Sequence, residues 1–160
     1  MKVRAVQLPT GSLLERYRCE GGYVDCFIAE VGQELTLPGL IEAFYTSRAF
    51  RPERWLLGTL LRRRADDDDV RRLAAAEVQQ FSAWSVEART TDQILLCDFQ
   101  GRTRSWLMVA PVAGGTRLHF GSAVVPATSR FDQLIFDLLL GFHRWYSRRL
   151  LKSAVRNLAY

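Results

Sequence analysis

Cysteine and histidine are scarce in this chain. Three cysteines, Cys19, Cys26 and Cys97, show no CxxC spacing, and two histidines cannot complete a recognisable zinc set with them. We therefore expect reduced, structural cysteines, no metal and no cofactor.

Long apolar runs and the usual nucleotide and nucleophile motifs are also missing. No run of about eighteen apolar residues exists, and the N-terminus lacks the apolar stretch of a signal peptide. Gly101 and Gly114-Gly115 lie between predicted strands rather than before a helix, so they do not form a phosphate-binding loop, and no serine or cysteine sits in a nucleophile-elbow pattern. With 160 residues, the chain is predicted to be one cytoplasmic domain, residues 1–160, without membrane insertion.

Lysine is nearly absent, so the basic balance comes from arginine. The formal charge is +5 and the pI about 9.5, yet Lys2 and Lys152 are the only lysines. A high pI without clustered aromatics and a known motif does not indicate a nucleic-acid site. We expect no nucleic-acid partner.

One charged patch, RRRADDDDVRR at residues 62–72, stands out. Its arginines and aspartates recur four residues apart, a spacing that supports a helical surface. Adjacent aspartates point around a helix rather than to one ion, so a solvated helix start or connector is favoured over a cation site.

The first half of the chain predicts one strand and then two or three helices. YVDCFIAEV, residues 23–31, reads as a strand between glycines. Thr36 can cap a helix with apolar residues at helical spacing up to Tyr45, Pro52 stands near the start of a second helix, and a third is predicted from the aspartates to about Gln79.

The second half changes to a period of two. Four strands, FSAWSVEA, DQILLCDF, TRSWLMVA and TRLHFGSAVV, are separated by short turns and predict an antiparallel meander, with Lys2 to Gln7 as a further edge strand. One long helix is predicted from Ser129 to about Leu158. The fold class is therefore α+β, with an antiparallel sheet packed on a long C-terminal helix.

Two-residue turns predict the register of the meander and hence its two faces. Counting places Asp98 opposite Thr103, Leu96 opposite Ser105, and Leu107 opposite Ser122. One face is apolar with small hydroxyls, so we expect it to meet the helices.

Serines on that face remove side-chain volume where a filled core would hold Val or Leu, which favours a cavity under the C-terminal helix. The alternative is that each serine bonds locally to backbone. The candidate ligand-binding residues are Ser85, Leu96, Asp98, Ser105, Leu107, Phe120, Ser122, Leu139, His143 and Tyr146.

Asp98 and His143 are the candidate catalytic residues. A carboxylate among apolar side chains needs a partner or a raised pKa, and an inward histidine can transfer protons. The alternatives are that Asp98 sits at the strand end or bonds Thr103, and that His143 is a satisfied core residue.

The opposite face is predicted to be too apolar for an uncovered surface. Either the N-terminal residues or a second copy of the chain covers it. A homodimer would use Trp84, Leu95, Phe99, Trp106 and Met108.

The C-terminal helix segregates its charges. Arg144, Arg148, Arg149, Lys152 and Arg156 share one arc, and the opposite arc is apolar. The favoured reading is a core helix with a solvated side. Attachment to a lipid surface or another acidic partner is the alternative.

The predicted order of elements is similar to the helix-grip architecture of the START-like or SRPBCC superfamily. This order is a strand, helices, a meander and a long C-terminal helix, and it covers about residues 22–158. The words YVDCF, LIEAFYTS, DQILLCDFQGRTRSWLMV and LLGFHRWYSRRLLKSA look like an uncharacterised bacterial domain-of-unknown-function family. The superfamily resemblance implies a cavity for an apolar small molecule such as a lipid, polyketide or aromatic compound, sometimes with cyclase, lyase or hydrolase activity. It carries no active-site residue onto this chain.

The sequence thus leaves three functional hypotheses. The first is binding of an apolar small molecule between the sheet and the C-terminal helix. The others are an enzyme that uses the same cavity, and an association module acting through the outer face of the sheet.

Overall fold

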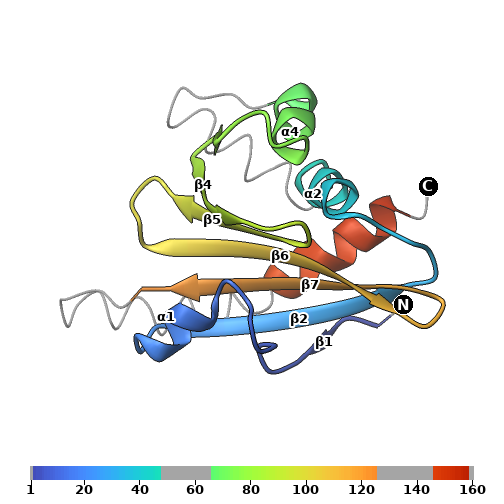
Figure 1. Cartoon of the computed structure of the whole chain (residues 1–160), viewed down its shortest axis with the longest axis horizontal. Coiled ribbons are helices and arrows are strands. Elements are labelled where there is room, and N and C mark those ends of the chain that lie inside the picture. Colours follow the sequence, from blue (N-terminus) through green and yellow to red (C-terminus); the bar gives the residue numbers. More distant parts are fainter. Residues whose placement is uncertain (1, 48–65, 126–145, 159–160) are drawn as a thin grey trace.

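An antiparallel sheet forms the centre of the molecule (Figure 1). The computed structural model describes residues 2–47, 66–125 and 146–158. In this part of the chain seven strands lie in the order β1-β2-β7-β6-β5-β4-β3. They are β1 Arg4–Ala5, β2 Tyr23–Val31, β3 Gln80–Phe81, β4 Trp84–Arg89, β5 Gln93–Asp98, β6 Thr103–Val112 and β7 Gly115–Val124. The α+β class and the bounds of β2 are confirmed, and β1 is the edge strand expected near the N-terminus.

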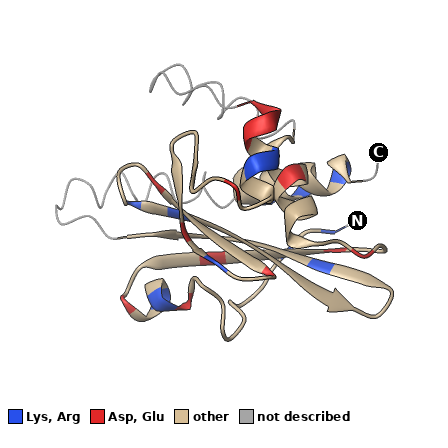
Figure 2. Ribbon diagram, turned by 45° about the horizontal axis from the view of Figure 1, so that its top comes forward, with Lys and Arg blue, Asp and Glu red and all other residues tan. Residues whose placement is uncertain are grey.

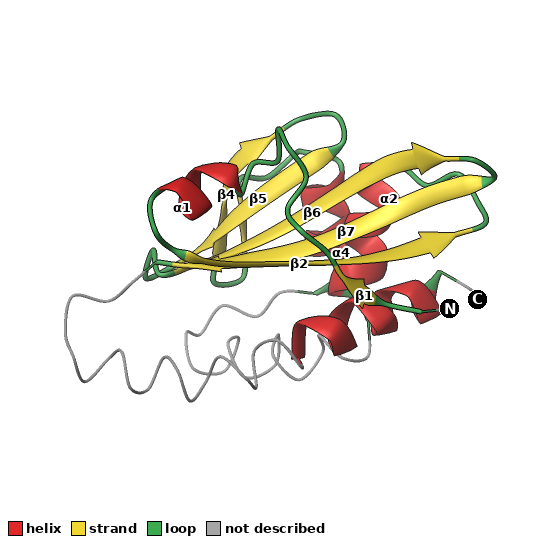
Figure 3. Ribbon diagram, turned by 90° about the horizontal axis from the view of Figure 1, so that it is seen from below, coloured by secondary structure: helices red, strands yellow, loops and turns green. Residues whose placement is uncertain are grey.

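Helices cover both faces of this sheet. The described helices are α1 Glu15–Cys19, α2 Leu37–Tyr45, α4 Asp67–Ala74 and a C-terminal helix at residues 146–157. The sheet lies between α1 and the C-terminal helix (Figure 3). We call the face that carries Phe27 and Leu107 the helix-side face, because α2, α4 and the C-terminal helix pack there. The face that carries Cys26 and Trp106 is the N-terminal face, because the segment before β2 packs there.

The predicted helix at Thr36 is confirmed as α2. The Thr36 side chain accepts a hydrogen bond from the Gly39 amide, and Pro38 stands in the first turn, where its missing N–H costs nothing. Leu40, Ile41 and Phe44 are buried against the sheet. The helix reaches along the helix-side face as far as Tyr45.

The run of aspartates starts α4, as predicted. Asp66 accepts hydrogen bonds from the amides of Asp68 and Asp69, and Asp69 accepts one in return from the amide of Asp66. Acidic residues occupy the first turn and basic residues the last, which suits the helix dipole (Figure 2).

α4 is shorter than predicted, because it ends at Ala74 rather than near Gln79. Ala76 adopts a positive φ of 61°, which terminates the helix. The Arg89 guanidinium then donates to the carbonyls of Leu73 and Ala74, at 2.7 and 2.6 Å. An arginine from the sheet therefore caps the helix.

The predicted strand FSAWSVEA is in fact two strands. Ser82 has a φ of 53°, and the chain turns there so that Phe81 pairs with Trp84. A β-bulge between Val86 and Ala88 then shifts the register by one residue, which exchanges the faces of the preceding positions. Trp84 consequently lies on the helix-side face, opposite to its predicted position.

The register between β6 and β7 differs by two residues from the prediction. Val112 pairs with Gly115, so the turn is Ala113-Gly114, with Gly114 at a φ of 79°. Gly115 belongs to the strand, where a Cβ atom would lie 1.9 Å from the Val31 carbonyl oxygen. An even shift keeps every side chain on its predicted face, but Leu107 pairs with Phe120 instead of Ser122.

The C-terminal helix buries the predicted arc where the structure describes it. Leu150, Leu151 and Ala154 are buried, whereas Lys152 and Arg156 are exposed. The predicted start at Ser129, and the stretch up to residue 145, lie outside the described residues. At the other end, the Asn157 amide donates to the Thr46 hydroxyl and the Ala43 carbonyl beside the end of α2.

The N-terminal segment covers the apolar face that was considered for a homodimer. Leu14 and Tyr17 pack with Cys26, Leu95 and Trp106 in one buried cluster. Leu95 and Trp106 are fully buried and Met108 packs against the same cluster, while Trp84 lies on the other face and Phe99 is 58% exposed. The five residues therefore do not form one exposed surface, because the chain supplies its own cover.

Candidate functional site

Three polar side chains form a line across the helix-side face, which we call the polar row. They are Asp25 on β2, Ser122 on β7 and Ser105 on β6, paired by register as Asp25 with Ser122 and Ser122 with Ser105. All three are buried. The next positions on the same line are Leu96 on β5 and Val86 on β4, so the row is polar at the β2 end and apolar at the other.

Asp25 is held firmly by Ser122. One carboxylate oxygen, Oδ1, accepts hydrogen bonds from both the amide and the hydroxyl of Ser122, at 3.0 and 2.6 Å. A hydroxyl that donates to a carboxylate keeps its own lone pairs directed elsewhere, so it can still accept a hydrogen bond. The pair thus presents a fixed carboxyl group and a hydroxyl oxygen that can accept a hydrogen bond.

Tyr45 brings a hydroxyl from α2 to the other end of the polar row. Its oxygen lies 3.4 Å from Oγ of Ser105, and the Tyr45 side chain is 1% exposed. Its ring contacts Phe44 and Phe81 at centroid distances of 5.1 and 5.2 Å, and Phe44 contacts Phe120 at 4.7 Å. An aromatic wall therefore stands beside the hydroxyls.

Asp98 lies on β5, two residues after Leu96, and pairs with Trp84 on β4. Its Oδ1 accepts hydrogen bonds from the amides of Arg102 and Thr103, at 2.8 and 3.2 Å. Half-buried at the strand end, this carboxylate stabilises the β5–β6 turn, which is the alternative that the sequence left open. It borders the polar row but is occupied by the backbone.

The structure brings some of the other predicted site residues together and separates one. Ser85 lies on the N-terminal face, paired with Cys97, and its hydroxyl donates to the Cys97 carbonyl at 3.4 Å; the bulge explains this error. Leu139 and His143 lie outside the described residues. The helix-side core contains Leu96, Leu107 and Phe120, and Tyr146 is partly buried against it.

Two titratable groups on the strands that carry the row lie on the opposite face of the sheet. Burial, with a smaller contribution from the charge of Asp25, raises the pKa of Cys26 to about 12, so its thiol stays neutral. Cys26 also points to the N-terminal face. His119 lies on that face too, paired with Met108 and tilted against Trp106 at 5.9 Å between ring centroids.

Sequence reasoning missed Asp25 and Tyr45. Asp25 shares the strand phase of Phe27 and Ala29, so continuing the alternation through YVDCF would have placed it on the helix-side face. Tyr45 was assigned only to the apolar side of its helix. No local pattern indicated that its hydroxyl would reach Ser105, which is 60 residues away.

Metal ligands and membrane spans can be assessed for the described ranges only. Within them, no group of three or more His, Cys, Asp or Glu side chains is arranged to hold a metal ion. The three cysteines are free. No helix in the same ranges has the length and apolar character needed to cross a bilayer.

The arrangement can orient a polar group by hydrogen bonds within an apolar and aromatic setting. It offers hydroxyls from three elements and a carboxylate from a fourth. Comparisons of the chain with protein-family models, with curated proteins and with solved structures found no match.

Proposed function

We propose that this protein binds an apolar small molecule whose polar group contacts the polar row. The carrying observation is a buried line of a carboxylate and two serine hydroxyls, extended by Tyr45, among the apolar side chains of the helix-side core. The ligand class expected from the START-like resemblance is a lipid, a polyketide or an aromatic compound.

The composition of the row supports this proposal. Burying hydroxyl and carboxyl groups costs desolvation free energy, which local hydrogen bonds only offset. Valines at Ser105 and Ser122 would fill more volume and add to the apolar contact between sheet and helices. A ligand-binding role explains why these positions are polar, whereas a contribution to stability does not.

The order of the strands adds further support. β2 pairs with β7, the intervening strands form a meander, and the C-terminal helix lies on the helix-side face. In the helix-grip architecture that this order resembles, the ligand lies between the sheet and the last helix. The polar row faces the same layer.

Catalysis in the same place is the weaker hypothesis. On the described residues, the helix-side face carries no imidazole, because His119 lies on the N-terminal face. Asp98 is engaged by two turn amides. An acid or base would have to come from Asp25 or from the candidate His143, which the structure does not describe.

Native mass spectrometry of the purified full chain tests the proposal first. We expect a co-purified small molecule, or thermal stabilisation by members of a panel of fatty acids and aromatic ketones. The proposal is wrong if no molecule co-purifies and no member of the panel raises Tm.

Matched hydroxyl deletions then locate the site. Ser105→Ala and Tyr45→Phe each remove one hydroxyl without adding volume, and each is expected to weaken binding about fivefold, the loss of about 1 kcal/mol for one hydrogen bond. Ser85→Ala is the control, because its hydroxyl lies on the opposite face. Equal losses in the control and in the row variants would place the ligand elsewhere.

A further inference from the structure

The exposed side of the C-terminal helix, where the structure describes it, carries charges of one sign only. The helix, residues 146–157, contains Arg148, Arg149, Lys152 and Arg156 and no acidic residue. The formal charge of the whole chain is +5, and these four residues contribute +4 of it. All four are exposed.

Arginines outside this helix differ in that many of them are paired with carboxylates. Seven of them, outside this helix, form ion pairs with carboxylates: Arg4, Arg16, Arg18, Arg71, Arg72, Arg104 and Arg117. By contrast, Arg148, Lys152 and Arg156 have no carboxylate partner in the part of the chain that the structure describes. Arg148 only stacks over the Phe27 ring, at 5.6 Å.

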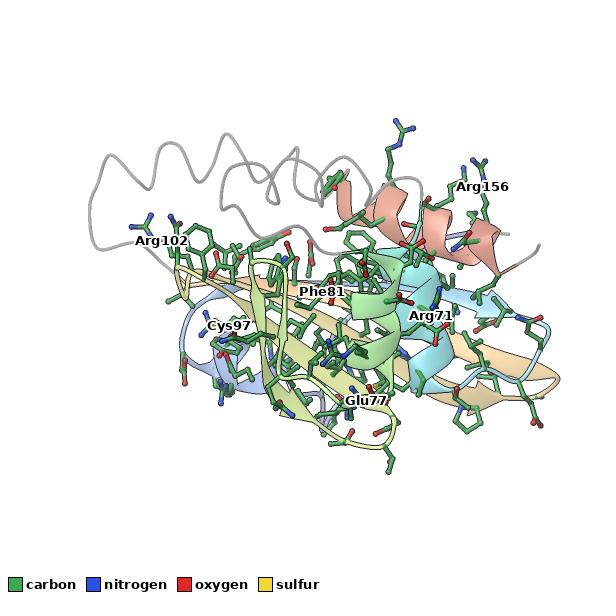
Figure 4. All side chains as sticks on the ribbon, turned by 90° about the horizontal axis from the view of Figure 1, so that it is seen from above. Arg71, Glu77, Phe81, Cys97, Arg102 and Arg156 are labelled. Carbon is green, nitrogen blue, oxygen red and sulfur yellow. The ribbon has the colours of Figure 1, made fainter. Side chains whose placement is uncertain are left out.

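These three cations recur at every fourth residue and wind gradually around the helix, and we call them the cationic row. They are spaced four residues apart, about 6 Å along the helix axis at 1.5 Å per residue. The helix is fixed from behind by Leu150, Leu151 and Ala154, and Asn157 ties it to α2. Arg156 points away from the sheet (Figure 4).

We infer that the cationic row is a docking surface for an anionic lipid bilayer. A surface of negative headgroups can contact exposed cations on a helix without any matching groove. Sequence-specific binding of a nucleic-acid duplex would need polar side chains that reach base edges, and the Asn157 amide of this helix is already bonded beside the end of α2. Three to four cations make such binding weak, reversible and sensitive to salt.

The inference does not depend on the proposed ligand site. Lys152 and Arg156 of the cationic row lie on the exposed side of the helix and Arg148 reaches the sheet at Phe27, whereas the polar row is buried on the sheet beneath the helical layer. Either can therefore fail alone.

Cosedimentation of the full chain with vesicles tests it. We expect binding to phosphatidylcholine vesicles that contain phosphatidylserine, no binding to pure phosphatidylcholine, and loss of binding as salt is raised. The double variant Lys152→Gln/Arg156→Gln should weaken binding about 25-fold, since each cation near such a surface contributes about fivefold.

Arg71→Gln/Arg72→Gln is the matched control. It removes the same net charge from the last turn of another exposed helix, where Asp68 and Glu77 already pair with the arginines. Binding should fall less than threefold. The inference is overturned if no variant or wild-type chain binds the anionic vesicles, if both double variants lose binding equally, or if a duplex oligonucleotide of equal phosphate concentration competes the chain off the vesicles.

Discussion

The two faces of the sheet are buried by different means. The helix-side face is covered by α2, α4 and the C-terminal helix through apolar side chains. The N-terminal face is covered by a short segment whose described helix, α1, has only five residues. Both covers exclude water from strand β6, where neighbouring residues Trp106 and Leu107 are each 0% exposed.

Polar anchors hold the N-terminal segment. The Gln93 side chain accepts from the Leu13 amide and from the Trp106 indole N–H, and it donates to the Gly11 carbonyl, at 3.1, 2.9 and 3.3 Å. Gly121 makes room beneath, because a Cβ there would lie 2.8 Å from Cδ1 of Leu14. One glutamine thus ties the segment to the sheet by two hydrogen bonds, and the Trp106 indole holds the glutamine from within the sheet.

A second anchor uses charge. The guanidinium groups of Arg16 and Arg104 each lie 4.7 Å from the centroid of the Tyr17 ring, and the Tyr17 hydroxyl donates to Glu87. Arg104 also bonds Glu87 at 2.9 Å. The same β-bulge that misled the strand count leaves Glu87 on this face.

The difference follows from backbone hydrogen bonding. A helix satisfies its own N–H and C=O groups, so it can cover a face with apolar side chains alone. An irregular segment has unsatisfied backbone groups and loses more conformational entropy per contact. Side chains of the sheet must therefore bond its backbone, as Gln93 does.

Truncating the two neighbouring residues of β6 gives the largest expected effects. Trp106→Ala should lower the free energy of unfolding by about 3–5 kcal/mol and Leu107→Ala by about 2–5 kcal/mol, because each leaves a cavity in a closed layer. Urea unfolding followed by circular dichroism measures both. If Trp106→Ala costs under about 1 kcal/mol while Leu107→Ala costs its full amount, the N-terminal segment does not cover the sheet in solution.

Removing the glutamine anchor should cost less. Gln93→Ala leaves the Trp106 indole N–H and the Leu13 amide without their acceptor, and we expect a loss of about 1–3 kcal/mol. Hydrogen exchange should accelerate in residues 10–20 and stay unchanged in α2. The exposed Gln100→Ala is the control and should change stability by no more than about 0.5 kcal/mol. Equal rates of hydrogen exchange in residues 10–20 of the two variants would contradict the role of Gln93 as an anchor.

The local sequence pattern was enough to predict the elements whose conformation depends on residues close together in the sequence. The alternation of YVDCFIAEV gave β2, Thr36 gave the start of α2, and the aspartates gave the start of α4. Caps and strand periods act over a few residues, which is why they can be read from a single sequence.

The errors arose where one residue changes the phase. The positive φ of Ser82 splits the predicted strand in two, and the bulge before Ala88 moves Ser85 to the face opposite to its predicted one; neither position is a glycine. The polar row was not predicted for a different reason. Asp25 and Ser122 are 97 residues apart and meet only because β2 pairs with β7. Pairing between distant strands depends on the whole sheet rather than on local pattern.

The smallest expected effect concerns the pH response of the N-terminal face. Burial of His119 beside Trp106 lowers its pKa, with a further contribution from Arg117, against an opposing hydrogen bond with the Met108 backbone. Arg117 is itself paired with Glu30, and no further charged group is bonded to the imidazole in the described ranges. The Nδ1 atom is buried and has no hydrogen-bond partner in this part of the chain, so the folded state favours the neutral ring.

Below about pH 6.5 the unfolded chain therefore binds a proton before the folded chain does, and the free energy of unfolding falls as pH falls through that value. One proton limits the slope to about 1.4 kcal/mol per pH unit. Urea midpoints measured at about pH 7.5 and 5.5 should differ in the wild type and converge in His119→Gln. His143→Gln is the matched control, because it removes the only other histidine. If the pH dependence of the urea midpoint persists in His119→Gln and vanishes in His143→Gln, the titrating group is His143. The N-terminal face would then make no pH-dependent contribution to stability, contrary to the prediction.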